Sequence, residues 1–260
     1  MKACICLINY YSKKELLKLL NSLPEEAVSL DIYVFDNTEE RELKMFNHFR
    51  IHKLISDGLN KGYFGRINDF ITMIDKKNYN FYLYGNCDIL FTKDFFKNLF
   101  KTNLETPSVI APKILSVKND FNLNPKYEGK PKKVKIKRLK IIFKNRMLFD
   151  LYQRLAKIKS HLLSYLNSGN EDKKRTIYCP HGSILIFNHI SALKLCNHYP
   201  IFLFGEEIFL SENCLKSNTP IWYIPKLIVS NIGEVSISKS TKINSRYVES
   251  LDFILKNYYN

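Results

Sequence analysis

The sequence predicts an α/β fold in which a mostly parallel central sheet is flanked by helices and carries a basic, partly helical insert. The chain has 260 residues, is 45% hydrophobic and contains only 9 Gly and 9 Pro, which is enough apolar chain for one sizeable core. Short apolar runs alternate with helical patterns through the first half, as in βαβ units. These observations exclude a disordered chain, a collagen and a small disulfide-bonded scaffold.

The first half predicts strands and helices in alternation. The run from Ala3 to Asn9 is apolar almost throughout, which is typical of a strand buried on both faces. The Ser12-x-x-Glu15 pattern is a capping box, and it opens a helix with an apolar face of leucines at positions 16, 17, 19, 20 and 23. Further strands are expected at residues 30–35, 52–56, 81–84 and 109–115, and further helices at residues 67–74 and 94–100.

The second half continues the alternation beyond the insert. A strand is expected at residues 183–187, and helices at residues 191–196, 206–215 and 244–258. Residues 221–230 are interpreted as two short strands that break at Pro225, because proline cannot donate a hydrogen bond to a neighbouring strand. No internal repeat is visible, so we expect a single domain over residues 1–260.

The net charge of +15 is concentrated in one segment. Residues 126–175 contain 16 Lys or Arg against 4 acids, a net charge of +12, whereas the other 210 residues carry only +3. We therefore define residues 122–176 as the basic insert. A charge of this size at one place indicates an anionic partner, either a membrane surface or a nucleic acid.

An apolar stripe at helical spacing lies within the basic insert. It comprises Leu148, Leu151, Leu155, Ile158, Leu162 and Tyr165, while Arg154, Lys157 and Lys159 fall outside it. An amphipathic basic helix of this kind suits peripheral contact with an anionic membrane surface. The alternative is that the stripe packs on the protein's own core or on a second subunit, as in a homo-oligomer.

The apolar runs and the cysteines predict a cytoplasmic protein. If the insert binds lipid, we expect the protein to be peripheral on the inner face of the cell membrane. The longest apolar runs are far shorter than the roughly 18 residues that a membrane-spanning helix needs. The six cysteines form no CxxC pair and have no repeated spacing, so we expect reduced thiols rather than a zinc site or disulfides. No recognised nucleic-acid motif is present, so no specific nucleic-acid partner is expected.

Polar residues follow several of the predicted strands at the point where each strand ends. They are Asn9-Tyr10-Tyr11, Asp36-Asn37, Asp57-Gly58 and Asn86-Cys87-Asp88. In an open α/β sheet the ligand lies at the carboxyl ends of the strands. A carboxylate at Asp36 suits a nucleoside, and one at Asp88 suits a divalent cation on a diphosphate. The alternative for each is an ordinary turn, because Asp and Asn favour turns.

Two further segments carry candidate chemistry. Residues 58–68 contain three glycines before a predicted helix, where a phosphate can bind, although the spacing is neither that of a Rossmann loop nor that of a Walker loop. Glu206 and Glu207 are adjacent acids in an apolar setting, and one of them can serve as a general base with a pKa raised by burial. The alternatives are a flexible loop and an ordinary complement to the helix dipole.

Taken in order, these segments resemble the family 2 glycosyltransferases of the GT-A fold, especially the rhamnosyltransferase-like bacterial branch. The resemblance covers residues 3–115 and 178–236. Asn9-Tyr10-Tyr11 resembles the family's N-Y-N, Asp36-Asn37-Thr38 its D-N-x-S, and residues 62–68 its G-F-x-x-G-x-N. Asn86-Cys87-Asp88-Ile89 resembles the N-P-D-V form of the DXD motif, and residues 200–207 resemble the F-D-E-x-F-F-x-Y-x-E-D segment.

The resemblance implies a GT-A-like (Rossmann-like) domain. It also implies an inverting enzyme of bacterial surface polysaccharide synthesis. Such an enzyme transfers a hexosyl or deoxyhexosyl group from a nucleotide-sugar donor to a glycan or lipid-linked glycan acceptor. Glu207 is then the catalytic base, and Mg²⁺ or Mn²⁺ is the cofactor, held by Asp88 and more weakly by Asn231. The implied donor-binding residues are Asn9, Tyr10, Tyr11, Asp36, Gly62, Gly65, Asn68, Asn86, Asp88 and Gly182.

Some residues depart from the family pattern. Glu207 stands where the family has Asp, Arg66 where a small residue is usual, and Asn231 near a metal-binding His. His181 lies beside Gly182, where it can approach the diphosphate or the acceptor, or serve a structural role. Two other classes remain as alternatives, a basic nucleic-acid-binding protein and a non-catalytic partner-binding protein on the same fold. A nucleotidyltransferase is disfavoured because the first strand is not followed by a glycine-rich phosphate loop.

Overall fold

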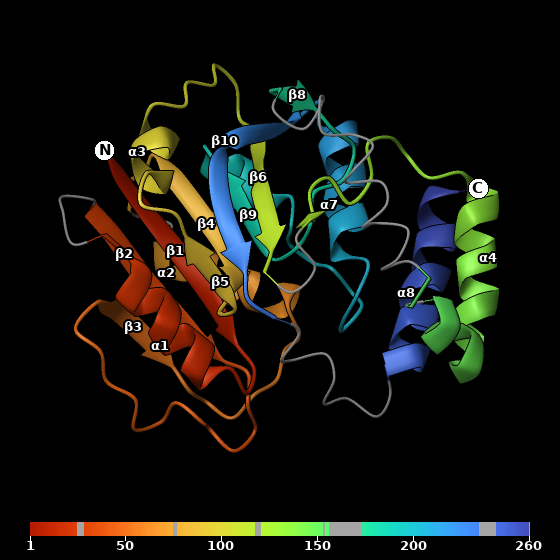
Figure 1. Ribbon diagram of the computed structural model, residues 1–260, viewed down its shortest axis with the longest axis horizontal. Helices are drawn as coiled ribbons and strands as arrows, with labels where there is room; N and C mark the ends of the chain where they lie inside the picture. Colours follow the sequence, from red (N-terminus) through yellow and green to blue (C-terminus); the bar gives the residue numbers. More distant parts are fainter. Residues whose placement is uncertain are drawn as a thin grey trace.

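The computed structural model describes residues 1–24, 29–74, 77–117, 121–152, 154–155, 173–233 and 243–259. Their strands form one mixed sheet in the order β3-β2-β1-β4-β9-β6-β10-β5, with β7 beside β6 and β8 beside β10 (Figure 1). The strands are β1 Lys2–Asn9, β2 Ser29–Asp36, β3 Ile51–Ile55, β4 Phe81–Asn86, β5 Ile89–Phe91, β6 Val109–Ser116, β7 Phe121–Asn122, β8 Arg175–Thr176, β9 Ile184–Phe187 and β10 Ile221–Asn231.

Helices cover the sheet and form a separate layer at one end of it. They are α1 Lys13–Ser22, α2 Ile67–Ile74 with the preceding 3-10 turn Phe64–Arg66, α3 Phe95–Phe100, α4 Lys133–Lys144, α6 Ile190–Lys194, α7 Glu206–Lys216 and α8 Ile243–Tyr258. Residues 146–152 are also helical. The predicted α/β class, with its mostly parallel sheet and flanking helices, is therefore confirmed.

Strand direction places the predicted strand ends together. β3, β2, β1 and β4 are parallel to one another, so their carboxyl ends lie at one edge of the sheet. β6 and β10 are parallel, while β9 runs antiparallel between β4 and β6. The short strand β5 turns back after Asp88 and pairs antiparallel with the end of β10, where Ile89 lies opposite Asn231. This pairing brings the end of β10 to the end of β4.

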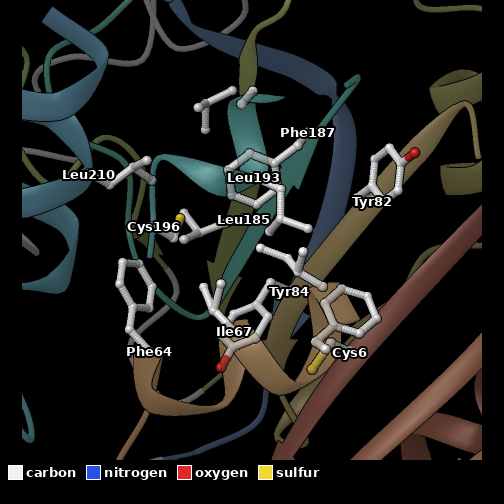
Figure 2. Packing of buried hydrophobic residues seen from close by; sticks show 14 of the residues in the cluster. Cys6, Phe64, Ile67, Tyr82, Tyr84, Leu185, Phe187, Leu193, Cys196 and Leu210 are labelled. Carbon is white, nitrogen blue, oxygen red and sulfur yellow. The ribbon is translucent and has the colours of Figure 1, made fainter. Parts of the chain in front are cut away.

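Alternating side chains of β1 supply both faces of the sheet. Cys4 and Cys6 point into the cluster under α2, α6 and α7, and Ile5 and Leu7 into the cluster under α1 and α3. Both faces of this strand are buried, which explains why its sequence is apolar at successive positions. Figure 2 shows the first cluster, where Tyr84 of β4 packs with residues of the 3-10 turn, α2, β9, α6 and α7.

A third cluster joins the basic insert to the C-terminal helix. Ile136, Leu139 and Phe143 of α4 pack against Leu251 and Ile254 of α8, together with Ile208 of α7. In Figure 1, α4 and α8 lie side by side at one end of the molecule, with α7 between them and the sheet. Part of the insert is thus an integral layer of the fold.

Three local predictions are wrong in detail. Ser12 precedes α1, but its hydroxyl donates to the carbonyl of Tyr10 at 3.0 Å, so the predicted capping box does not form. β10 is one strand rather than two, since a register shift between Ile224 and Ile228 accommodates Pro225. Leu17 is exposed, whereas the other leucines of the predicted face of α1 are buried.

The described part of the apolar stripe faces solvent. Leu148, Leu151 and Leu155 are 44%, 53% and 55% exposed, while Phe149 between them is buried in the third cluster. The alternative that the stripe packs on the protein's own core is therefore wrong for these three residues. Ile158, Leu162, Tyr165, Lys157 and Lys159 lie outside the described residues.

The structure of the described residues bears on the predictions about membrane-spanning helices and thiols. No helix among the described residues is long and apolar enough to span a bilayer. The six cysteines are all buried, and all are free thiols.

Candidate active site

Asp36 organises the carboxyl ends of the parallel strands. It is fully buried, and its Oδ1 accepts hydrogen bonds from Asn9 Nδ2 at 3.1 Å and from the Thr38 hydroxyl and amide at 2.7 and 3.2 Å. Its Oδ2 accepts from the Leu43 amide at 2.9 Å and the Ser56 hydroxyl at 2.7 Å. Burial alone raises the pKa of Asp36, but these donors outweigh burial and hold the pKa below its usual value. This geometry favours a positioning role for the carboxylate over direct contact with a nucleoside.

β1 ends at the buried Asn9, and the partly exposed Tyr10 and Tyr11 follow it. Asn9 is fully buried, and its amide also donates to Glu42 at 3.0 Å while its oxygen accepts from the Ser12 amide. Tyr10 and Tyr11 are partly exposed, and their rings meet edge to face with centroids 4.8 Å apart. The Tyr11 hydroxyl donates to Glu40. The two rings are therefore the part of this motif that can line a binding surface.

Arg66 holds the glycine-bearing loop. Its buried guanidinium donates to both carboxylate oxygens of Asp57, at 2.6 and 2.8 Å, and to Asp69 at 3.1 Å. Its Nε donates to Asn37 Oδ1 at 2.8 Å, so the loop is fixed to the end of β2. The arginine that departs from the family pattern thus has a structural role that a small residue cannot supply.

Gly62 brings this loop against the segment that precedes α7. Its φ is +74°, and an added Cβ would lie 2.0 Å from the carbonyl oxygen of Phe202. Its own carbonyl accepts a hydrogen bond from Asn37 Nδ2 at 2.8 Å. Gly65 is crowded by Lys61, whereas Asn68 is exposed on the first turn of α2. The loop therefore links the end of β2 to the start of α7.

Residues 181–183 connect the two halves of the site. The Ser183 carbonyl accepts from the Asn86 amide at 3.0 Å, and the Ser183 hydroxyl accepts from Asn231 Nδ2 at 3.1 Å. The Gly182 carbonyl accepts from the Tyr63 hydroxyl at 2.5 Å, and an added Cβ on Gly182 would lie 2.8 Å from Glu207 Oε1. The segment that carries Asp88 therefore contacts Ser183, and Glu207 lies against the neighbouring Gly182. Consecutive Cα atoms are about 3.8 Å apart, so these two contacts are close together.

Asp88 is a buried carboxylate with an unused oxygen. It is 7% exposed, and its Oδ1 has no hydrogen-bond partner. Burial raises the pKa of Asp88 to about 7, with a smaller contribution from Glu15. Its main-chain carbonyl accepts from the Ile232 amide at 2.9 Å, which places the neighbouring Asn231 beside it. A buried carboxylate that lacks a partner is suited to a cation or another donor supplied by a ligand.

The donor set around Asp88 fits a divalent cation that is shared with a substrate. The described residues contain no group of three His, Cys, Asp or Glu that could enclose a metal by themselves. Mg²⁺ in nucleotide-dependent sites typically takes one or two carboxylates plus substrate phosphates. Asp88 Oδ1 supplies the carboxylate oxygen, and Asn231 retains its amide oxygen because its nitrogen binds Ser183. These residues therefore fit the predicted Mg²⁺ or Mn²⁺.

Glu207, rather than Glu206, is the ionised member of the acidic pair. Glu206 is buried and accepts from the Phe204 amide at 3.0 Å, and burial followed by the charge of Glu207 raises its pKa well above the usual value. Burial also disfavours ionised Glu207, but the Lys126 ammonium 2.9 Å from its Oε1 lowers the pKa below its usual value. The expectation of a base with a raised pKa is therefore wrong for Glu207.

The structure brings most of the predicted site residues to one place. Asn86 and Asn231 both bond to Ser183, and Gly182 lies against Glu207. Asp88 is two residues beyond Asn86 and bonds to the residue after Asn231. Asp36 connects to this group through Asn37 and Gly62. Asn9 is internal, and Asn68 is exposed on the first turn of α2.

Sequence reasoning missed Lys126 and Asn124, which lie at the start of the basic insert. The Asn124 side chain accepts from the His181 amide at 2.6 Å. The His181 ring is turned toward Ser183, whose amide lies 3.3 Å from Nδ1, and burial lowers the pKa of His181 to about 4. A neutral imidazole in this place orders the 181–183 turn.

Comparison with solved structures identifies the fold. The chain is similar to GalNAc-T7, solved with UDP, GalNAc and Mn²⁺, at a TM-score of 0.60 and 11% identity over 97% of this chain. It is similar to residues 1–349 of S. aureus TarS at 0.52 and 13% over 99%, and to the mannosyltransferase PcManGT from Pyrobaculum calidifontis, solved with GDP-Man and Mn²⁺, at 0.50 and 12% over 92%. This chain covers 48%, 73% and 58% of the three structures respectively.

These likenesses confirm the predicted GT-A fold, because each neighbour is a GT-A glycosyltransferase. The chain spans about half the length of the GalNAc-T7 structure. No protein-family model matches the sequence, and no curated protein matches it in sequence. Membership of family 2, and of its rhamnosyltransferase-like branch, stays a prediction.

Proposed function

We propose that this protein is an inverting glycosyltransferase that moves a hexosyl or deoxyhexosyl group from a nucleotide-sugar donor to a hydroxyl of a glycan or lipid-linked glycan, in the synthesis of a bacterial surface polysaccharide. The observation that carries the proposal is that the segments of both acids contact the turn 181–183: Asn86, two residues before Asp88, bonds to Ser183, and Glu207 lies against Gly182. The fold neighbours add support, since two of them were solved with UDP or GDP-Man and Mn²⁺.

In the proposed reaction, Glu207 removes the proton from the acceptor hydroxyl. The acceptor oxygen forms a bond to the anomeric carbon from the face opposite the donor diphosphate, and the bond from that carbon to the phosphate oxygen breaks. The nucleoside diphosphate leaves with the bonding electrons, and the configuration at the anomeric carbon is inverted. Glu207 is ionised before the reaction, as a general base must be.

Asp88 and Asn231 serve the leaving group. When Mg²⁺ or Mn²⁺ is bound there, it supplies positive charge that stabilises the departing diphosphate. Tyr10 and Tyr11 present ring surfaces near the ends of β1 and β2, where a nucleobase can stack. Asp36 and Arg66 hold the loops that carry these contacts, so we assign them positioning roles in donor binding.

The proposal is tested by screening nucleotide sugars for thermal stabilisation in Mn²⁺, followed by a search for transfer to glycan acceptors. We expect a stabilising donor whose effect is lost with chelator or in Asp88→Ala, and transfer that is lost in Glu207→Gln with donor binding retained. Asp94→Ala and Glu105→Gln, both on exposed carboxylates, are matched controls that should behave as the natural protein. Full transfer activity in Glu207→Gln contradicts its assignment. Binding of bulk RNA or DNA without binding of any nucleotide sugar supports the alternative class.

We also propose that the basic insert docks the enzyme on an anionic membrane. Exposed apolar residues on α4 and residues 146–155 lie among exposed bases, and the apolar ones are Val134, Ile141, Met147, Leu148, Leu151 and Leu155. Lys137, Arg138 and Lys144 of α4 are exposed between them. Each base near an anionic surface contributes about 1 kcal/mol, and the apolar side chains add area buried among lipids.

Vesicle flotation tests this docking. We expect binding to vesicles that contain phosphatidylglycerol and none to phosphatidylcholine alone. Leu151→Glu and Lys137→Glu should reduce binding, whereas Leu215→Glu, on a leucine 56% exposed at the end of α7, and Lys97→Glu on α3 should not. Equal flotation with both lipids, or equal loss in the control variants, contradicts the proposal. A concentration-dependent dimer that Leu151→Glu disrupts assigns the face to a second copy instead.

A further inference from the structure

Lys126 extends from the beginning of the basic insert into the candidate active site. Its ammonium lies 2.9 Å from Glu207 Oε1, and the Glu207 side chain is only 12% exposed. Lys126 lies between β7 and α4, far from α7 in the sequence. The ion pair therefore joins two segments that the fold alone brings together.

The main chain on both sides fixes the place of Lys126. The Asn124 side chain donates to the Pro112 carbonyl at 2.7 Å and accepts from the His181 amide at 2.6 Å. Tyr127 exchanges main-chain hydrogen bonds with Cys179 at 3.2 and 2.9 Å. Anchors two residues before Lys126 and one residue after it fix the main chain from which its side chain reaches Glu207.

The Glu207 carboxylate also lies against the main chain at Gly182. Gly182 has no side chain, and this allows Oε1 to approach its Cα closely. Among the described residues, the charged and titratable groups around Glu207 are Lys126, Glu206, His181, Tyr63, Tyr127, Cys179 and Tyr199. Lys126 is the one cation in this set, because the His181 ring is neutral.

We propose that Lys126 is a positioning residue that selects Glu207, and not Glu206, as the base. This inference rests on the proposed glycosyl transfer at the same site. Two adjacent carboxylates in a poorly solvated place cannot both ionise without a nearby cation. Of the two carboxylates, Lys126 pairs with Glu207, while Glu206 turns toward the Phe204 amide. The ion pair thus decides which carboxylate carries the charge and fixes where that charge points.

The pairing also gives the basic insert a second role. Its first residues complete the active site, while its helical part faces away from the sheet beside α8. Replacement of Lys126 by an uncharged residue leaves Glu207 without its cation, and Glu207 then gains affinity for a proton. The base is protonated at a higher pH, and transfer fails in a pH range where the natural enzyme works.

The test compares pH profiles of kcat/KM for Lys126→Met, Lys126→Arg and Lys132→Met, the last being a control that removes an exposed lysine of the same insert. In Lys126→Met we expect the acid limb to move up by about one pH unit or more, because a nearby opposite charge changes a carboxyl pKa by about 1–3 units. Donor binding, measured by thermal shift, should stay unchanged. Lys126→Arg should restore the profile, and Lys132→Met should keep it.

A second measurement is independent of turnover. In protein with ¹³C-labelled glutamate, the carboxyl signal lost in Glu207→Gln identifies Glu207, and its titration midpoint should rise in Lys126→Met. An unmoved midpoint and an unmoved acid limb overturn the inference, as does a Lys126→Arg variant no better than Lys126→Met. If no donor or acceptor supports transfer, the proposed function fails, and the NMR titration still decides whether Lys126 sets the charge of Glu207.

Discussion

Replacement of Gly62 by alanine tests the contact that joins the glycine-bearing loop to the segment before α7. The φ of +74° is strained for alanine, which costs about 1–2 kcal/mol. The added Cβ would also lie 2.0 Å from the Phe202 carbonyl oxygen, so one of the two backbones must move. Overpacking of this kind costs about 1–3 kcal/mol, and we expect a total loss of about 2–5 kcal/mol in the free energy of unfolding.

Two other glycines separate these contributions. Gly58 has a similar φ of +79°, but the nearest atom to an added Cβ belongs to the flexible Arg41 side chain at 3.1 Å, so Gly58→Ala should lose about 1–2 kcal/mol. An added Cβ on Gly129 meets nothing within 4 Å, so Gly129→Ala should stay within about 0.5 kcal/mol. Urea unfolding of the three variants measures the order. A Gly62→Ala variant as stable as Gly58→Ala refutes the close approach of the two loops.

Three further predictions concern charge. Arg66→Met should lose about 3 kcal/mol of unfolding free energy in urea, because it strands Asn37 and two carboxylates, whereas Arg146→Met at an exposed site should change little. Folded Glu206 keeps a proton that the unfolded chain has lost, so this group should make stability fall as pH rises from about 5 to 7, by at most about 1.4 kcal/mol per unit. Because Asp88 and His181 also titrate differently in the folded and unfolded chain, the test is the difference in slope between the natural protein and Glu206→Gln, and equal slopes in the two contradict the assignment. Isothermal titration should show Mn²⁺-dependent binding of the donor in the natural protein and not in Asp88→Ala, and equal Mn²⁺ dependence in both rejects Asp88 as a ligand.

The elements that could be predicted are those whose signal is local. β1 is buried on both faces and therefore has a continuous apolar sequence, and α2 begins and ends where its periodicity does. Asp88 and Glu207 could be proposed because strand ends and helix starts are visible as boundaries in the sequence. That their segments both contact the turn 181–183 follows from the fold and not from either boundary.

The features that were missed depend on pairing between distant segments. β5 has three residues, and only its partner β10 makes it a strand. β10 continues past Pro225 because β6 accommodates a register shift that composition does not reveal. Periodicity did not reveal the surroundings of the described part of the apolar stripe, since Phe149, rather than Leu148 or Leu151, packs in the third cluster with α8.

The protonation states of Asp36 and Glu207 could not be predicted from the sequence for the same reason. The donors that satisfy Asp36 include the Leu43 amide and the Ser56 hydroxyl, which come from two other segments. In the sequence, Lys126 is one of many bases in the insert, and nothing marks it as the partner of Glu207. An ion pair in the fold thus reversed the expected direction of the pKa of Glu207.

The central claim is that Asp88 and Glu207, whose segments both contact the turn 181–183, serve one reaction. A crystal structure of the protein with a non-hydrolysable nucleotide sugar and Mn²⁺ tests it most directly. We expect the metal on Asp88, the diphosphate beside Asn231, and the anomeric carbon facing Glu207 with space for an acceptor hydroxyl between them. A donor bound elsewhere, or a sugar that points away from Glu207, contradicts it.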